Sequence, residues 1–178
     1  MSPIKVVEII NLAVAILFAL CYTYQFVYIL ISLFVPMKSH KKTSLHRYAV
    51  MISARNEENV LPHLLDSLRA QDYPADYFTV FVIADNCTDR TAEVARAGGA
   101  VVYERNNANL VGKGYALDFL LSNIKADYGE DAFDAYMIFD ADNLLNPDYI
   151  TEMNKTFSDG YQIITSYRNS KNYGDNWI

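Results

Sequence analysis

A run of 27 consecutive residues without a charged side chain, from Ile9 to Val35, constrains this chain more than any other feature. As a helix with a rise of ~1.5 Å per residue it would be roughly 40 Å long, more than the ~30 Å hydrocarbon core of a bilayer. A cleaved signal peptide is the alternative, but the apolar core of such a peptide has only ~7–15 residues. We therefore expect a transmembrane helix within residues 1–36.

The charges on either side of this run predict its orientation. Only Lys5 precedes it, offset by Glu8, whereas six basic or histidine residues follow it: Lys38, His40, Lys41, Lys42, His46 and Arg47. Positive residues flanking a membrane helix favour the cytoplasmic side. The sequence thus predicts a single-pass protein of the cell membrane, with a basic juxtamembrane linker over residues 37–47 and a cytoplasmic domain over residues 48–178.

The charge balance of the expected domain excludes one class of partner. From residue 48 onward there are 10 Lys and Arg against 20 Asp and Glu, a balance of −10. Nucleic-acid binding needs clustered Lys and Arg, so we expect no nucleic-acid partner. The two cysteines, Cys21 and Cys87, form neither a disulfide framework nor a zinc motif.

Apolar segments alternate with amphipathic segments through the domain. Strands are expected at residues 48–53, 78–84, 100–103, 135–139 and 161–166. Helices are expected after residue 58, over residues 91–97 and 115–123, and from Asn146, with Pro147 in the first turn. Near-continuous apolar strands are typical of parallel sheets covered on both faces. The sequence therefore predicts an α/β fold with an open, mostly parallel, Rossmann-like sheet.

Polar segments follow four of the expected strands, at residues 54–58, 85–89, 105–114 and 140–143. Ligands of open α/β sheets bind at the carboxyl ends of the strands. We therefore expect the functional residues to lie along this one edge.

Asp140 and Asp142 are the strongest candidates at that edge. Two carboxylates one residue apart, after the apolar segment Tyr136–Phe139, suit a hard cation such as Mg²⁺ or Mn²⁺ with substrate phosphates completing its shell. The alternative is a turn that contains Asp twice, because Asp and Asn are common turn residues.

Asp85 and Lys113 occupy comparable positions. An ionised Asp85 accepts hydrogen bonds only, which suits a base N–H or a ribose hydroxyl; the alternative is that it caps the next helix, a role that Thr88 or Asp89 also fits. Gly112 and Gly114 flank Lys113 at the start of a helix, which is typical of a phosphate site, although the motif is not a P-loop.

In their order and spacing, these segments resemble the family 2 glycosyltransferases of GT-A fold, the group that includes cellulose- and hyaluronan-synthase-like enzymes. The matching segments are residues 50–58 (VMISARNEE), 82–91 (VIADNCTDRT), 112–117 (GKGYAL) and 139–142 (FDAD). The resemblance extends over residues ~48–178, the nucleotide-sugar half of the fold.

The resemblance implies a role for each matching residue. Four consecutive residues would line the nucleotide: Ala54, Arg55, Asn56 and Glu57. Asp85 would contact the base, usually uracil, and Lys113 would lie by the base or the diphosphate. Asp140 would face the sugar or ribose, and Asp142 would ligate Mg²⁺ or Mn²⁺. Many members have two adjacent aspartates after the second strand, whereas this chain has Ala84 before Asp85.

The implied activity is sugar transfer from a nucleotide-diphosphate sugar, with UDP-sugars favoured, to a glycan or lipid acceptor. An inverting transfer also needs a general base. In the family this base is a carboxylate well beyond the paired aspartates, so it is expected beyond Ile178 and the domain is expected to be incomplete. Two alternatives remain: a nucleotide-sugar-binding module without turnover, and a phosphoryl or nucleotidyl transferase, which also uses paired aspartates with Mg²⁺.

Overall fold

The computed structural model describes residues 2–34 and 43–167, which belong to two separate units. The first unit, Met1–Ser39, holds the helix α1 (Pro3–Phe34), and the second, His40–Ile178, holds the globular domain. Most of the expected basic linker, residues 37–42, lies outside the described residues.

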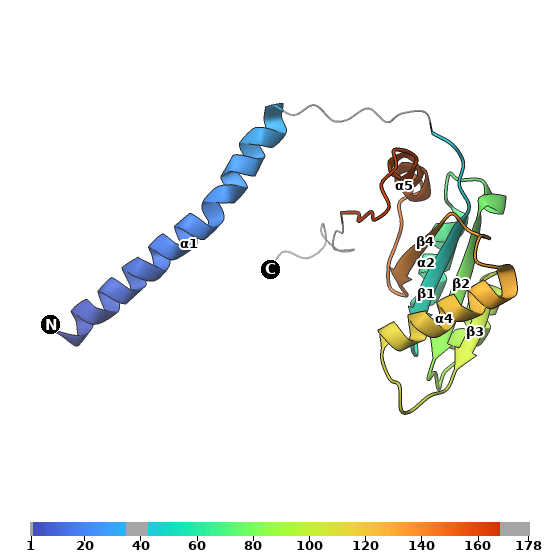
Figure 1. Cartoon of the computed structure of the whole chain (residues 1–178). Helices are drawn as coiled ribbons and strands as arrows, with labels where there is room; N and C mark the ends of the chain where they lie inside the picture. Colours follow the sequence, from blue (N-terminus) through green and yellow to red (C-terminus); the bar gives the residue numbers. More distant parts are fainter. Residues whose placement is uncertain (1, 35–42, 168–178) are drawn as a thin grey trace. The chain divides into compact units, whose positions relative to one another are not determined.

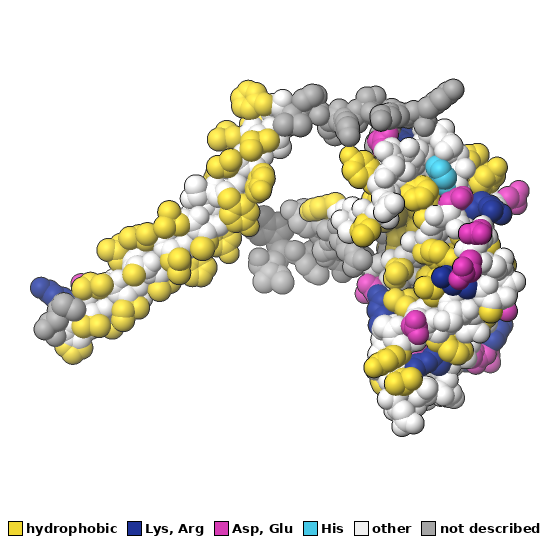
Figure 2. All heavy atoms as spheres, in the orientation of Figure 1, with side chains coloured by type: hydrophobic (Ala, Val, Ile, Leu, Met, Phe, Trp, Pro, Cys, Tyr) yellow, Lys and Arg dark blue, Asp and Glu magenta, His cyan; other side chains and the backbone are white. Residues whose placement is uncertain are grey.

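Helix α1 has the length and composition of a membrane span. None of its 32 residues is buried, and its most apolar 18-residue window has a mean hydropathy of 2.3. Hydrophobic side chains cover it along its whole length (Figure 2). The hydroxyls of Thr23 and Ser32 donate to Ala19 O and Ile29 O, both at 2.7 Å, so these polar groups are satisfied within the helix. Such internal pairing is what a helix surrounded by hydrocarbon requires.

The domain contains a four-stranded parallel sheet with the order β3-β2-β1-β4 (Figure 1). Its strands are β1 (Tyr48–Ala54), β2 (Phe78–Asp85), β3 (Val101–Arg105) and β4 (Ala135–Asp140). Its helices are α2 (Leu61–Arg69), α3 (Thr91–Ala97), α4 (Lys113–Tyr128) and α5 (Tyr149–Ser158), with the short 3-10 helix η1 (Ala75–Tyr77) before β2. The predicted open, parallel α/β fold is confirmed.

Helices cover both faces of the sheet, which explains why the central strands are apolar throughout. On one face, side chains of α2, α3 and α5 pack against alternate strand residues, among them Val50, Ile52 and Val82. On the other face, Ala116, Leu120 and Ile124 of α4 pack against the intervening residues, including Ala49, Met51, Phe81 and Ile83. Strand residues alternate between faces, so β1 supplies both cores.

Two sequence predictions near the end of the domain are wrong. The expected strand at residues 161–166 is absent, because this segment pairs with none of the described strands and Ile163 is 89% exposed. Apolar content alone does not make a strand, since a strand exists only within a hydrogen-bonded ladder. Helix α5 begins at Tyr149, so Pro147 precedes the helix and does not lie in its first turn.

A buried amide fixes the segment that enters β1. Asn154 of α5 is 4% exposed. Its Oδ1 accepts a hydrogen bond from the Tyr48 hydroxyl at 2.8 Å, and the same oxygen lies 3.0 Å from His46 Nδ1. Its Nδ2 donates to Ser44 O at 2.8 Å. Burial raises the pKa of Tyr48, so its hydroxyl stays protonated and available as a donor. Asn154 thereby ties α5, β1 and residues 44–46 together at the amino end of the sheet.

Candidate functional site

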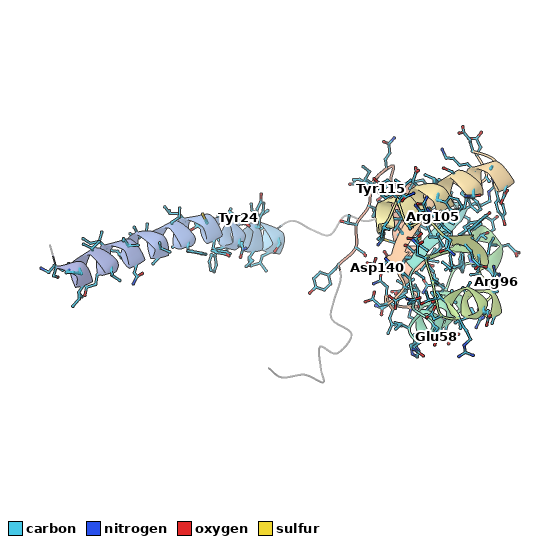
Figure 3. The ribbon with its side chains drawn as sticks, turned by 90° about the horizontal axis from the view of Figure 1, so that it is seen from below. Tyr24, Glu58, Arg96, Arg105, Tyr115 and Asp140 are labelled. Carbon is cyan, nitrogen blue, oxygen red and sulfur yellow. The ribbon has the colours of Figure 1, made fainter. Side chains whose placement is uncertain are left out.

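The register of the sheet brings the ends of the strands together at one edge. In the parallel ladders Ser53 of β1 pairs with Asp140 of β4, and Asp85 of β2 pairs with Arg105 of β3. Figure 3 shows Arg105 and Asp140 at this end of the sheet. The four polar segments expected at the carboxyl edge therefore begin from neighbouring strand ends.

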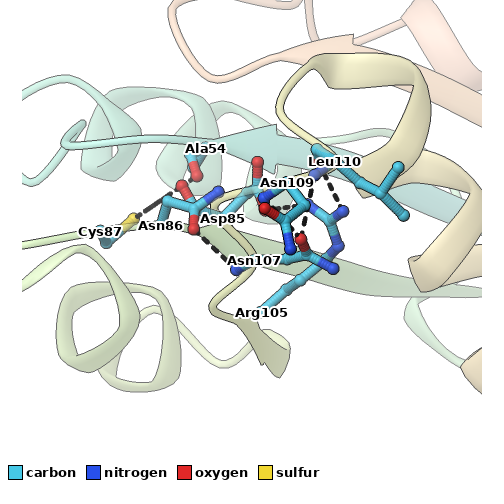
Figure 4. A network of polar contacts seen from close by, with 8 residues as sticks. All are labelled: Ala54, Asp85, Asn86, Cys87, Arg105, Asn107, Asn109 and Leu110. Carbon is cyan, nitrogen blue, oxygen red and sulfur yellow. Dashed lines mark hydrogen bonds and ion pairs between the residues drawn. The ribbon is translucent and has the colours of Figure 1, made fainter.

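Asp85 forms a buried ion pair with Arg105. The distance from Arg105 Nη1 to Asp85 Oδ1 is 2.6 Å, and the two side chains are 6% and 7% exposed, respectively. Arg105 Nη2 also donates to Leu110 O at 2.6 Å (Figure 4). The second carboxylate oxygen of Asp85, Oδ2, makes no hydrogen bond to the residues of the chain that are described. Asp85 therefore keeps one carboxylate oxygen without a hydrogen-bond donor among the described residues, in a residue that is 5% exposed.

Two asparagines in left-handed conformations shape the loops after β1 and β2. Asn56 and Asn86 have φ values of 57° and 52°, a region that Asn tolerates better than most residues. Asn56 Oδ1 accepts a hydrogen bond from Thr88 N at 2.8 Å, and Asn86 Oδ1 accepts one from Asn107 N at 2.8 Å. Each asparagine thus anchors the loop of a neighbouring strand.

Asp89 has a structural role at the start of α3. Its carboxylate accepts hydrogen bonds from Thr91 N at 3.0 Å, from the Thr91 hydroxyl at 2.5 Å and from Glu58 N at 3.2 Å. The hydrogen bond from the Thr91 hydroxyl lowers the pKa of Asp89. Asp89 therefore joins Glu58 to Thr91, the first residue of α3, whereas the N-cap position itself is Arg90, which makes no side-chain cap hydrogen bond.

Lys113 and Asp140 meet in a half-exposed ion pair at the same edge. Lys113 is the first residue of α4, directly after Gly112, whose φ of 136° is unfavourable for other residues. An ammonium group and a helix N-terminus at one place favour an anion. The structure thus brings the candidate phosphate residue against the first of the paired aspartates.

Asp140 and Asp142 also belong to a turn. Asn143 N donates to Asp140 O at 3.0 Å, and Asp140 N donates to Asn143 Oδ1 at 3.2 Å. The side chain of Asp142 is exposed, and its Oδ1 lies 3.4 Å from Asn143 Nδ2. The turn and the carboxylate pair are therefore compatible, because the turn leaves Asp142 facing solvent.

The residues described contain no group of three His, Cys, Asp or Glu side chains that could hold a metal ion by themselves. Asp142 could supply one oxygen ligand, and Mg²⁺ binds readily through one or two carboxylates when substrate phosphates and water complete its shell. The donor set therefore fits a metal that binds together with a diphosphate.

Residues 54–57, at and after the end of β1, contribute unevenly to this edge. Ala54 lies in the core, with the whole residue 1% exposed, and its carbonyl oxygen accepts a hydrogen bond from the Cys87 thiol at 3.5 Å. Arg55 is exposed and makes no hydrogen bond or ion pair with other described residues. Glu57 N donates to the Thr91 hydroxyl at 2.8 Å, which joins this segment to the start of α3.

Sequence reasoning missed Arg105, which it placed only as the start of a polar loop. Its pairing with Asp85 depends on the register of β2 and β3, which the sequence does not specify. One signal was present in the sequence. Arg105 comes shortly after the strand expected at residues 100–103, and the carboxylate Asp85 comes directly after the strand expected at residues 78–84.

The open parallel sheet with helices on both faces is of the GT-A-like α/β type. Residues 46–178 match the family model described as glycosyltransferase like family 2. The chain therefore belongs to this family. A mannosyltransferase from Pyrobaculum calidifontis, whose structure was solved in complex with GDP-Man and Mn²⁺, shares the fold, with a TM-score of 0.59 and 23% identity over 83% of this chain and 43% of that one.

Two curated relatives are similar over shorter segments. The 4,4'-diaponeurosporenoate glycosyltransferase of Staphylococcus haemolyticus (strain JCSC1435) is 38% identical over 108 residues, 58% of this chain and 26% of that protein. The protein of the same name from Staphylococcus aureus (strain USA300) is 47% identical over 55 residues, which are 31% of this chain and 14% of that protein. The chain thus spans about a quarter or less of the length of these relatives.

Proposed function

We propose that this chain is the nucleotide-sugar-binding part of a membrane-anchored, metal-dependent glycosyltransferase with an inverting mechanism. The observation that carries the proposal is the convergence of Asp85, Lys113, Asp140 and Asp142 at one sheet edge, where ligands of such folds bind. The family match supports sugar transfer over phosphoryl or nucleotidyl transfer, which the paired aspartates alone would also allow.

The proposed donor is a nucleotide-diphosphate sugar, with UDP-sugars favoured. Asp85 Oδ2 would accept a hydrogen bond from the base, and residues 54–57 would line the nucleotide. Lys113 would leave its ion pair with Asp140 and bind the diphosphate instead. An ammonium group binds a doubly charged phosphate group at least as well as it binds a carboxylate. In this proposal Asp140 faces the ribose or the sugar.

Asp142 is the proposed ligand of Mg²⁺ or Mn²⁺. When bound, such an ion neutralises the negative charge that develops on the leaving diphosphate. Lys113 would stabilise the same charge from the N-terminus of α4, because a fixed donor aimed at a developing anion lowers the barrier. The Pyrobaculum mannosyltransferase with GDP-Man and Mn²⁺ supports a divalent ion at a site of this fold.

Helix α1 is the proposed membrane anchor, with the domain in the cytoplasm. Its hydropathy and its full exposure support a span, and the basic residues after it support this orientation. An acceptor held at or in the membrane fits an anchored domain. Among lipid and glycan acceptors, 4,4'-diaponeurosporenoate is the first to test, because both curated relatives are named for it.

Calorimetry on the full chain in detergent micelles tests the donor site. We expect UDP to bind with an affinity that increases when Mn²⁺ is added, and GDP is the second nucleotide to titrate. Asp142→Asn should remove the Mn²⁺ dependence while the domain stays folded. Asp148→Asn is the matched control, because Asp148 is a similarly exposed acid in the same segment between β4 and α5. If a folded chain binds neither UDP nor GDP with Mn²⁺, the proposed function is wrong.

A further inference from the structure

Arg105 links two parts of the candidate site, the end of β2 and the loop before α4. It ends β3, in register with Asp85 at the end of β2. Its guanidinium donates through Nη1 to Asp85 Oδ1 and through Nη2 to Leu110 O, each at 2.6 Å (Figure 4). Because Nη1 and Nη2 each donate to a partner within the chain, Arg105 would act on a ligand through these partners.

The first consequence concerns the orientation of Asp85. With Oδ1 held by Arg105, the carboxylate cannot rotate freely, and Oδ2 is the oxygen without a hydrogen bond to the described residues. A carboxylate accepts hydrogen bonds and donates none. Oδ2 therefore suits a base that offers a ring N–H, as uracil does at N3 and guanine at N1, whereas N3 of neutral cytosine carries no proton.

The second consequence concerns the loop between β3 and α4. The bond to Leu110 O fixes the far end of a turn in which Asn107 Oδ1 accepts hydrogen bonds from Asn109 N and Leu110 N, both at 2.9 Å. This turn leads within three residues to Lys113. The guanidinium of Arg105 thus fixes the orientation of the Asp85 carboxylate and also the path of the chain toward Lys113, the proposed ligand of the diphosphate.

We infer that Arg105 is a positioning residue for base recognition, and that the preference of the site for an N–H-bearing base depends on it. The inference rests on the proposed function, in which Asp85 contacts the base. Its distinctive consequence is a change in selectivity: losing Arg105 weakens binding of the nucleotide that Asp85 recognises and leaves binding of CDP nearly unchanged.

The test is calorimetry with UDP, GDP and CDP in the presence of Mn²⁺, on the full chain in detergent micelles. For Arg105→Gln we expect the preferred nucleotide to bind roughly tenfold or more weakly, the range of a hydrogen bond to a charged group. Arg105→Lys should lose less, since it keeps the charge but cannot fork to two acceptors. Arg96→Gln is the matched control, because Arg96 pairs with Glu104 on the surface of the same region and should change nothing.

The outcomes separate this inference from the proposed function. If the wild-type chain binds neither UDP nor GDP, both fail. Suppose instead that the wild-type chain binds UDP or GDP, while Arg105→Gln lowers the affinity for CDP as much as the affinity for that nucleotide, or lowers neither. The preference over CDP is then unchanged, and only the inference on Arg105 is overturned. Should Arg105→Gln not fold, Arg105→Lys decides: a selectivity ratio equal to that of the wild type overturns the inference, and a reduced ratio supports it.

Discussion

Replacing Lys113 by methionine should separate binding from stability. Lys113 pairs with Asp140, but the two side chains are 46% and 41% exposed. Exposed ion pairs contribute only ~0–1 kcal/mol, because solvent screens them. A cation at a helix N-terminus is also unfavourable by roughly 0.3–1 kcal/mol, which offsets the pair. We therefore expect the free energy of unfolding of Lys113→Met to stay within about 1 kcal/mol of the wild type.

The same change should weaken nucleotide binding considerably more. A hydrogen bond to a charged group contributes ~1.5–3 kcal/mol, which corresponds to roughly 10- to 150-fold in affinity. Because wild-type Lys113 must leave Asp140 to reach the diphosphate, the loss should lie near the lower end of that range. The affinity of UMP, which has a single phosphate, should fall less than that of UDP.

The assays are urea unfolding and calorimetry with UDP and Mn²⁺, with Lys125→Met as the control. Lys125 lies in the same helix, its side chain is 42% exposed, and its nearest acid, Glu130, is 3.7 Å away. Lys125→Met should leave the affinity unchanged. Equal losses of affinity in the two variants, or a loss of stability above about 2 kcal/mol in Lys113→Met alone, would show that the reasoning is wrong.

Three further predictions concern the domain itself. Leu120→Ala, at a fully buried position facing the sheet, should lower the free energy of unfolding by about 2–5 kcal/mol in urea. Asp89→Asn should destabilise the chain above about pH 5, because the folded state lowers the pKa of Asp89. Below about pH 4 the difference in stability from the wild type should shrink, because this carboxylate binds a proton. A constant difference in urea titrations from about pH 3 to 7 would contradict this prediction. Asn154→Leu should leave the Tyr48 hydroxyl without its acceptor and lower the melting temperature, whereas UDP binding at the opposite sheet edge should persist.

The sequence predicted the parts of the fold that depend on local pattern. Four parallel strands, their helices and the polar edge follow from apolar segments bounded by turn residues, and the structure confirms them. The strand at residues 161–166 failed because the prediction had no information on a pairing partner. Arg105 was missed for a related reason: its contact with Asp85 arises between two strands whose register is a tertiary property.

The strand order is compatible with the proposed site, in which a short stretch of edge serves both ends of one nucleotide. Asp85 follows β2 and Asp142 follows β4, with β1 between them in the sheet. Neighbouring strands lie ≈ 4.8 Å apart, so the base acceptor and the proposed metal ligand arise from strands about 10 Å apart. A ribose separates the base from the diphosphate, and residues 54–57, which begin at the last residue of β1, lie between the ends of β2 and β4. In the proposed site, Arg55 and Asn56 are the residues of this segment placed to contact the ribose, because they are exposed whereas Ala54 is buried.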